Sequence, residues 1–464
     1  MSEYGRRVKL SIILDLWEWP KGRLDQSMDI TKDVLSYTFQ KTIKSPEGVC
    51  QLSILPQRDG VHILDTIKIM DVIKIYEFDT LKYIGYVTRE SYSGAINTDG
   101  SPSRGAVIQC AQMGGLLLSA SMGLGMGTLL GKPEEELSQK TAELSVALEK
   151  ASDDGSSFGE VADLTLTAFF DYIVALGGSG LMNYINEYID TSVGIQCKKV
   201  SGLPKTYELM TGTEESINIW DVLSQMVERP FNELWVDNGP RTVQIDGEGV
   251  NLGGRSCLVF RPTPFDGTVT DGKVGKAFDA LPVVKIDKDH LISFDLARSL
   301  DEVYTVYNVK SPAFLLNDIV RILLGIPKVD NNLIGQYLMK PMVVELFFTR
   351  LLKKEGDAVD LIKSKAEKVA TEAATTLYNW YYNNANTFSG VVSMMVPTDS
   401  SLDPCIGDKI EIYGIEGQFY VEGISHSWSY QGPMKSDLSI TRGIGKDRTK
   451  LIDSVFVNNP IGMA

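Results

Sequence analysis

The chain has 464 residues and a formal net charge of −15, with 43% hydrophobic and 23% charged residues. This length accommodates about two to four globular domains of roughly 100–200 residues each. The acidic balance excludes a surface built to hold nucleic acid tightly, because phosphate contacts need clusters of Lys and Arg. The charge favours solubility first, and it also permits a lumen through which polyanions pass without sticking.

The five cysteines lie far apart and none belongs to a CxxC pair, which argues against both a disulfide framework and a zinc ribbon. A reducing compartment of synthesis fits this pattern. The first residues lead into alternating strand residues instead of a signal-peptide core. Apolar runs are short or interrupted by Gly, Lys, Pro or Glu, so we expect no membrane span.

The first 115 residues predict an antiparallel β domain. Polar and apolar residues alternate over 8–16, 30–42 and 49–55, and a meander follows over 71–110. Several short strands with turn signals between them are typical of a closed or nearly closed barrel, or of a sandwich. The Trp17 and Trp19 side chains face the same side of their strand, and we expect core or interface roles for them.

Residues 116–205 predict a helical insertion. The run over 116–130 is apolar but rich in Gly, Ser and Met, which is consistent either with ordinary core or loop, or with a segment that orders against a partner. Pro133 and the acids Glu134, Glu135 and Glu136 begin a helix, where negative charge is favoured. A second helix is predicted over 158–176.

Residues 206–288 predict a small α+β module. Asn218 to Val227 has apolar residues at helical spacing, and Pro230 ends that helix. About three strands follow, separated by turns.

A second β domain is predicted from 289–311 together with 388–446. Helices over 312–325, 332–354 and 357–383 would interrupt it as an insertion over 312–387, and 447–464 would be a tail for docking or disorder.

The two β regions repeat a pattern. Ile73–Tyr76 matches Ile410–Tyr413, and without a gap Tyr83-Ile84 then matches Tyr420-Val421 and Val87-Thr88 matches Ile424-Ser425. Tyr92 falls one place from the aromatic Trp428, and a Gly/Ser/Pro-rich connection and a further alternating strand follow in both copies. Any two meanders look alike to some degree, but the order of matched elements favours a duplicated β module.

Three stretches carry a resemblance to a known family. They are PFNELWVDNG at Pro230–Gly239, LVFRPTPFDG at Leu258–Gly267 and ISFDLARSLDEVYTVYNVKS at Ile292–Ser311, followed by the closing meander. In this order they resemble the baseplate hub proteins of contractile phage tails and phage-tail-like particles (the XkdQ-like group). The helical parts carry no signature of that family.

The resemblance implies an α+β fold, mainly antiparallel β, with two tube-protein-like β-barrel domains in one chain. It implies a homotrimeric ring with pseudo-six-fold symmetry that joins a hexameric tail tube to a trimeric central spike. The implied partners are the spike, the tail tube initiator or tube protein, the tape-measure protein and baseplate wedge proteins, without specific nucleic-acid binding. The expected location is the baseplate of a virion or tail particle, after synthesis in the bacterial cytoplasm.

We identify no catalytic, cofactor-binding or metal residue in the sequence. The histidines His62, His290 and His426 are far apart, and for His426 we expect a surface position or a structural hydrogen bond. The glycines of 123–127 lack the Lys-Ser/Thr pair of a P-loop, and consecutive acids at 134–136 point in different directions, unlike a glycosidase pair. The alternatives to a hub are a tail-associated cell-wall hydrolase and an adaptor of a non-contractile tail.

Overall fold

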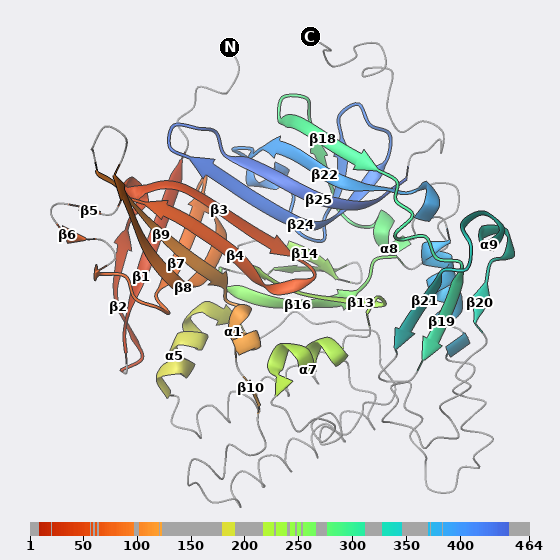
Figure 1. Cartoon of the computed structure of the whole chain (residues 1–464), viewed down its shortest axis with the longest axis horizontal. Coiled ribbons are helices and arrows are strands. Elements are labelled where there is room, and N and C mark those ends of the chain that lie inside the picture. Colours follow the sequence, from red (N-terminus) through yellow and green to blue (C-terminus); the bar gives the residue numbers. More distant parts are fainter. Residues whose placement is uncertain are drawn as a thin grey trace, which may run out of the picture.

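The computed structural model places both predicted β regions in regular strands (Figure 1). The structure describes residues 9–19, 21–55, 57–58, 61–62, 65–96, 102–119, 121–122, 179–190, 217–226, 229–238, 242–245, 248–251, 254–265, 276–310, 327–345, 370–371, 373–382 and 384–444. The predicted helices over 133–151, 158–176 and 312–325, the glycines of 123–127 and the tail over 447–464 lie outside these residues.

One 13-stranded sheet runs through the two β modules. The N-terminal module contributes β1 (Leu10–Glu18), β2 (Arg23–Asp29), β3 (Val34–Thr42), β4 (Ser45–Ile54), β7 (Val72–Glu77), β8 (Thr80–Ile96) and β9 (Pro102–Gln112). The C-terminal module contributes β17 (Val283–Ile286), β18 (Leu291–Ala297), β22 (Phe388–Met395), β23 (Lys409–Ile412), β24 (Gln418–Ser429) and β25 (Lys435–Ile444).

The two modules repeat one strand order. The N-terminal module runs β3-β4-β9-β8-β7-β1, and the C-terminal module runs β18-β22-β25-β24-β23-β17. The corresponding strands also follow each other in the same order along the chain. One difference is that β1 pairs antiparallel with β7, whereas β17 pairs parallel with β23. Another is that β2 is added outside β1. This topology agrees with the duplication indicated by the sequence.

The mainly antiparallel β character is confirmed, but two closed barrels are not. The path through the described strands is open, with β18 at one end and β2 at the other. The edge strand β3 pairs with β24 of the other module instead of closing onto its own module. The two modules therefore share a single sheet.

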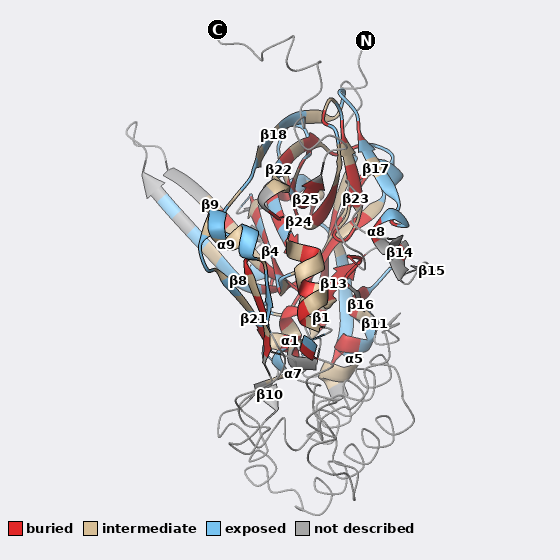
Figure 2. Ribbon diagram, turned by 90° about the vertical axis from the view of Figure 1, so that its right-hand side faces the viewer, coloured by how far each residue is buried: buried red, intermediate tan, exposed pale blue. Residues whose placement is uncertain are grey.

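Period-two alternation explains why these stretches form strands. In β4 every second residue from Pro46 to Ile54 is buried, which is the pattern of a strand with one face on a core. The N-terminal module packs its own core around Phe39, Cys50 and Ile108. The C-terminal module has a separate core, and Trp235 of the α+β module joins it. Buried residues gather along the inner faces of the strands in Figure 2.

The small α+β module contains α7 (Ile219–Met226) and a three-stranded sheet of β11 (Ile189–Asp190), β16 (Ser256–Pro262) and β13 (Asn232–Asn238). The hairpin of β14 (Thr242–Ile245) and β15 (Glu248–Asn251) lies beside it. The helix α5 (Ser179–Tyr188) covers β1, where Trp17 contacts Tyr184 and Tyr188. Figure 1 shows α1 (Gly115–Ser119), α5 and α7 on the same side of these sheets.

The prediction of one helix over 332–354 is wrong. The helix α9 (Asn331–Tyr337) ends before Leu338, which has a φ of 65°. The strand β21 (Pro341–Glu345) follows and pairs parallel with β19 (Val306–Lys310), which also pairs with β20 (Lys328–Val329). Pro341 offers no amide to a helix, and Val343 and Val344 favour a strand.

The pairing of strands also differs from the predicted domain limits in two places. The strand β19 lies in this separate three-stranded sheet, although the second β domain was expected to include 289–311. The strand β17 belongs to the 13-stranded sheet, although it precedes the expected boundary at 289.

Helical residues at 370–371 and 373–381 agree with the helix predicted over 357–383. Shorter elements are 3-10 helices at Thr31–Asp33, Asn384–Asn386 and Ser400–Leu402, β5 (Gln57–Arg58), β6 (Val61–His62), β10 (Ser121–Met122), β12 (Ile217–Asn218) and α8 (Lys276–Asp279). None of the helices in the described ranges is long and apolar enough to cross a membrane.

Candidate functional site at the junction of the two modules

The two modules meet along a backbone seam between β3 and β24. Seven residue pairs run antiparallel, from Gly423 opposite Thr42 to Ser429 opposite Ser36. Two aromatic pairs lie over the seam: the ring of His426 stacks on Phe39 with centroids 4.8 Å apart, and Trp428 stacks on Tyr37 at 5.9 Å. The seam is thus both hydrogen-bonded and packed.

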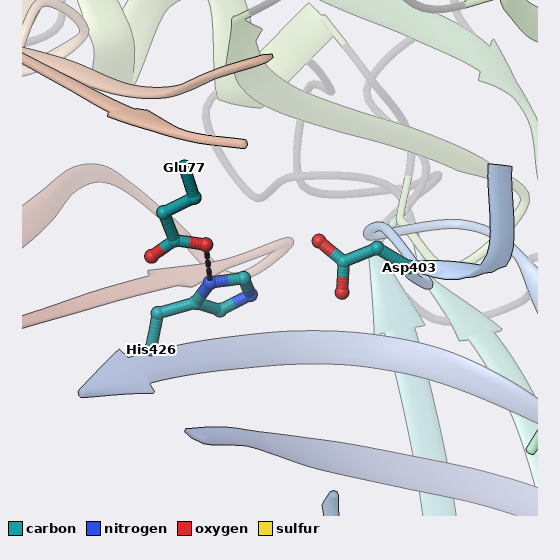
Figure 3. Close-up of side chains that lie close together, drawn as sticks. All are labelled: Glu77, Asp403 and His426. Carbon is teal, nitrogen blue, oxygen red and sulfur yellow. Dashed lines mark hydrogen bonds and ion pairs between the residues drawn. The ribbon is translucent and has the colours of Figure 1, made fainter. Parts of the chain in front are cut away.

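A buried acid meets a histidine across this seam. The Oε2 atom of Glu77, at the end of β7, lies 2.8 Å from Nδ1 of His426 on β24 (Figure 3). The Tyr37 hydroxyl donates to Oε1 of Glu77 at 2.5 Å. Burial raises the pKa of Glu77, but the charge of His426 and the hydrogen bonds from His426 and Tyr37 outweigh it, so this pKa is lowered. The carboxylate is held ionised between the modules.

A second ion pair crosses the same junction. The Lys82 ammonium on β8 lies 2.5 Å from Oδ2 of Asp403, which precedes β23, and the Asp403 side chain is 1% exposed. Burial lowers the pKa of Lys82, but the adjacent Asp403 carboxylate outweighs this, and the pKa is raised. Two ion pairs therefore connect the modules. The N-terminal module supplies the acid of one pair, Glu77, and the base of the other, Lys82.

A cavity of about 60 Å³ lies among these groups, lined from β3, β8, β13, β24 and the loop before β23. Three polar atoms at its wall are buried without a hydrogen-bond partner: Nε2 of His426, Oδ1 of Asp403 and Nδ2 of Asn238. Figure 3 shows the His426 ring edge facing the Asp403 carboxylate. Because one water needs roughly 10–15 Å³ of such space and two to four polar partners, the cavity suits water bridging these atoms.

Glu77, Asp403 and His426 could also hold a metal ion, since one ligand atom of each lies within 4.8 Å of the others. Both Glu77 oxygens, however, already accept hydrogen bonds from protein groups. The Lys82 ammonium also neutralises Asp403. We therefore assign the cluster a structural role, in which charges of the two modules satisfy each other.

The α+β module is attached to β24 through a buried arginine. The Arg261 guanidinium donates from Nε to Glu233 at 3.1 Å, and from Nη2 to the Tyr420 hydroxyl at 2.7 Å and the Gly407 carbonyl at 2.9 Å. Tyr420 in turn donates to Glu233 at 2.6 Å. Burial raises the pKa of Glu233, and Arg261 offsets this only in part. These contacts bring together two of the resembling motifs and the closing meander.

A further polar contact connects the same module to the N-terminal one. Lys41 on β3 donates to Oδ1 of Asn238 at 2.8 Å, and Gln112 at the end of β9 donates to the Val236 carbonyl at 3.1 Å. All three units therefore meet around the cavity. A relative movement of any one of them breaks buried polar contacts.

The structure places the residues singled out in the sequence as follows. For His426 the expectation was a surface position or a structural hydrogen bond. His426 is 1% exposed and hydrogen-bonded to Glu77, so the second is confirmed. His290 is far from this cluster in sequence and does not line the cavity. Trp17 is buried, which confirms a core position for it, whereas Trp19, stacked on it at 5.8 Å, is 36% exposed and its interface role stays a prediction.

The sequence did not indicate the partners of these groups. Glu77 and His426 are 349 positions apart, and Lys82 and Asp403 are 321 apart. The available signal was a charged residue on the apolar face of an alternating strand, as Glu77 follows Ile73 and Ile75 in VIKIYE. Its burial follows only once the two modules are placed side by side.

No protein-family model and no curated protein matches the chain. Several solved structures do. A tail protein from Neisseria meningitidis MC58 is 9% identical, with a TM-score of 0.48, covering 93% of this chain and 96% of that one. The 43 kDa tail protein of prophage MuSo2 from Shewanella oneidensis is 10% identical, with a TM-score of 0.47, covering 95% and 99%.

An Escherichia coli component of the type VI secretion system, reported to be similar in structure to the phage T4 tail proteins gp27 and gp5, is 8% identical. Its TM-score is 0.36, and the match covers 91% of this chain and 76% of that one. The chain is thus similar to phage tail proteins and to a secretion-system tail component.

Proposed function

We propose that this chain is a structural subunit of the baseplate hub of a contractile tail or injection particle. Three copies form a ring with pseudo-six-fold symmetry, which joins a hexameric tail tube to a trimeric central spike. The role is mechanical: the ring matches the two symmetries and transmits force during contraction. The other partners are the tape-measure protein and the baseplate wedge proteins.

One observation carries this proposal. Two modules with the same six-strand order lie side by side in one continuous sheet. Three chains with two such modules each supply six similar units, which is the number a hexameric tube presents. The solved structures compared above have TM-scores below 0.5, and this repeat and the motif resemblance therefore support the proposal.

The buried contacts at the junction fit the same role. The modules of a load-bearing ring have to keep a fixed relative position, and paired buried charges specify one arrangement because any other leaves a charge unpaired. The Glu77–His426 and Lys82–Asp403 pairs lie across the line where the modules meet. The formal charge of −15 suits a passage for DNA or an acidic effector.

The mass of the purified protein in solution, measured by light scattering, tests the proposal. The monomer is 51.2 kDa, and a species of about three times that mass is expected, alone or with a co-expressed candidate spike. A stable monomer under both conditions would overturn the trimeric hub. Zymography on the same sample would then address the cell-wall hydrolase.

A further inference from the structure

Two strand edges have no neighbouring strand among the described residues. The strand β18 pairs with β22 on one side only. The strand β8 is paired with β9 from Gly85 to Ile96, but β7 and the residues before it cover the other side only as far as Val87. Figure 2 shows the β8–β9 hairpin extending from the body of the chain. Open backbone edges of this kind are templates for strand addition.

The internal repeat relates these two edges to the seam. In the repeated strand order β18 corresponds to β3, and β8 corresponds to β24. Within the chain, β3 and β24 are the two strands that pair across the junction. The open edge of β18 is therefore the counterpart of the β3 edge, which in the chain is paired with β24. The open edge of β8 is the counterpart of the β24 edge, which in the chain is paired with β3.

The register of the counterpart contact follows from the sequence repeat together with the backbone pairing of the strands. The sequence repeat equates Val87 with Ile424. The successive cross-strand partners are Val87, Cys110, Cys50 and Phe39 in the N-terminal module, and Ile424, Leu438, Val392 and Phe294 in the C-terminal one. Phe294 on β18 thus corresponds to Phe39 on β3, and Asp295 corresponds to Gln40.

A bulge accounts for the one-place offset in the sequence repeat. Val87 pairs with Cys110 and Arg89 with Gln109, so Thr88 is an extra residue in β8. The strand β24 has no extra residue at the corresponding place, where Ile424 and Ser425 pair with consecutive residues of β25. Beyond the bulge, Arg89 therefore corresponds to Ser425, and Tyr92 corresponds to Trp428.

When the register of β3 and β24 is applied to β18 of one copy and β8 of another, complementary side chains lie opposite each other. Ser425 lies opposite Gln40 in the chain, which puts Arg89 of one copy opposite Asp295 of another. Trp428 lies opposite Tyr37, which puts Tyr92 beside the Leu291–Ile292 bulge of β18. Tyr92 is 48% exposed and Ile292 is 45% exposed in the single chain. The charges of Arg89 and Asp295 played no part in setting the register, so their complementarity supports it independently.

We infer that β18 of one copy pairs antiparallel with residues 89–92 of β8 in a second copy, in the register that β3 and β24 have within the chain. This inference rests on the proposed trimer and identifies the contact that closes it. The contact is head-to-tail, because two different edges meet, and it forms a closed ring when the rotation between successive copies closes after three of them. Junctions within and between copies then alternate around that ring.

Paired cysteines test the contact directly. In register, opposite Cα atoms of an antiparallel pair lie about 4.5–5.5 Å apart, which is within the span of a disulfide. Asp295→Cys and Arg89→Cys chains are tagged differently, co-expressed with a candidate spike and oxidised. A covalent heterodimer is expected from the mixture and not from either variant alone, and the double variant should give a covalent trimer.

Two controls accompany this experiment: one tests the register of the contact, and the other measures background disulfide formation. Asp295→Cys with Ser91→Cys is displaced by two residues along β8 and should give at least tenfold less heterodimer. The unmodified chain, in which Cys50, Cys110 and Cys257 are buried and Cys405 is partly buried, is oxidised in parallel and gives the background that the matched pair has to exceed. More heterodimer from the displaced pair than from the matched pair would overturn the register.

Light scattering on the same samples separates this inference from the proposed function. A trimer mass without a heterodimer from the matched pair would overturn the strand pairing and leave the trimeric hub intact. A monomer with and without the spike would overturn both. As a second readout, Asp295→Arg should weaken assembly at least tenfold, and Asp295→Arg combined with Arg89→Asp should restore it. Failure of this restoration despite folded chains would also count against the pairing.

Discussion

His426 Nδ1 lies 2.8 Å from the Glu77 carboxylate, and the two side chains come from different modules of the sheet. Both residues are 1% exposed or less in the chain. The same carboxylate accepts from Tyr37, so each of its two oxygens has a protein partner. A buried acid satisfied in this way makes the contact between modules specific, since neither module can bury it alone without a cost.

We expect His426→Ala to destabilise the chain strongly. The substitution leaves the Glu77 carboxylate buried with one partner fewer, and removing one member of a buried pair costs about 3–5 kcal/mol. Urea unfolding followed by fluorescence measures the change in the free energy of unfolding. His290→Ala is the matched control, because His290 does not line the cavity at the junction, and it should change stability by less than about 0.5 kcal/mol.

The lowered pKa of Glu77 predicts an acid-sensitive junction. A carboxyl with a folded pKa below its usual value of 4.5 contributes stability above that value and loses it as the pH falls through the folded pKa. The urea midpoint should therefore decrease below about pH 4.5. Glu77→Gln should reduce the slope of this decrease, and an unchanged slope would show that other carboxyls cause it.

The Lys82–Asp403 pair should couple far more strongly than an exposed pair. A double-mutant cycle with Lys82→Met and Asp403→Asn is compared with one for Lys44 and Glu422, whose charges lie 3.3 Å apart at the surface. We expect each buried single substitution to cost about 3–5 kcal/mol. The exposed pair should contribute about 0.2–1 kcal/mol, and less in high salt. Equal coupling energies would contradict a buried junction.

Arg261→Met should loosen the α+β module. The substitution removes the three hydrogen bonds described above and leaves Glu233 buried without its cation, which costs about 3–5 kcal/mol. Because burial already raises the pKa of Glu233, adding Glu233→Gln should recover part of the loss. In the Arg261→Met single variant, limited proteolysis read by mass spectrometry should show faster cleavage between this module and β24. No recovery in the double variant would mean that Arg261 acts mainly through packing on Trp235.

At Gly390 of β22 there is no space for a side chain, because β18 packs directly against this position. A Cβ atom at this position would lie 1.9 Å from the Asp295 carbonyl oxygen. Gly390→Val should therefore displace β18 and reduce stability by about 1–3 kcal/mol. Since Asp295 is the residue inferred to contact the next copy, the variant should also assemble less well. Gly254→Val, where a Cβ meets nothing within 4 Å, is the control.

Local pattern predicted most of the strands, and long-range pairing explains what it did not predict. Alternation located β4, β7, β8, β24 and β25, because each has one face on a core and its period shows that burial. The repeat of Val87 against Ile424 predicted the duplicated order, although the offset at Tyr92 was unexplained until the bulge at Thr88 was seen.

The candidate site was not predictable in the same way. Glu77 and His426 are ordinary polar residues in half-buried strands, and neither has a distinctive neighbour in the sequence. Their roles depend on β3 joining β24, a choice between modules that no local pattern contains. The strand at Pro341–Glu345 was missed for a related reason, since its partner β19 is paired in parallel and distant.

The seam between β3 and β24 also determines how the chain responds to a pull. Its seven residue pairs run along the strands, so a force directed along those strands loads all of their backbone hydrogen bonds at the same time. A force that peeled β3 sideways from β24 would instead break them one after another. The chain is therefore stiff in one direction and weak in another. A single-molecule pulling experiment would register this anisotropy as two very different rupture forces.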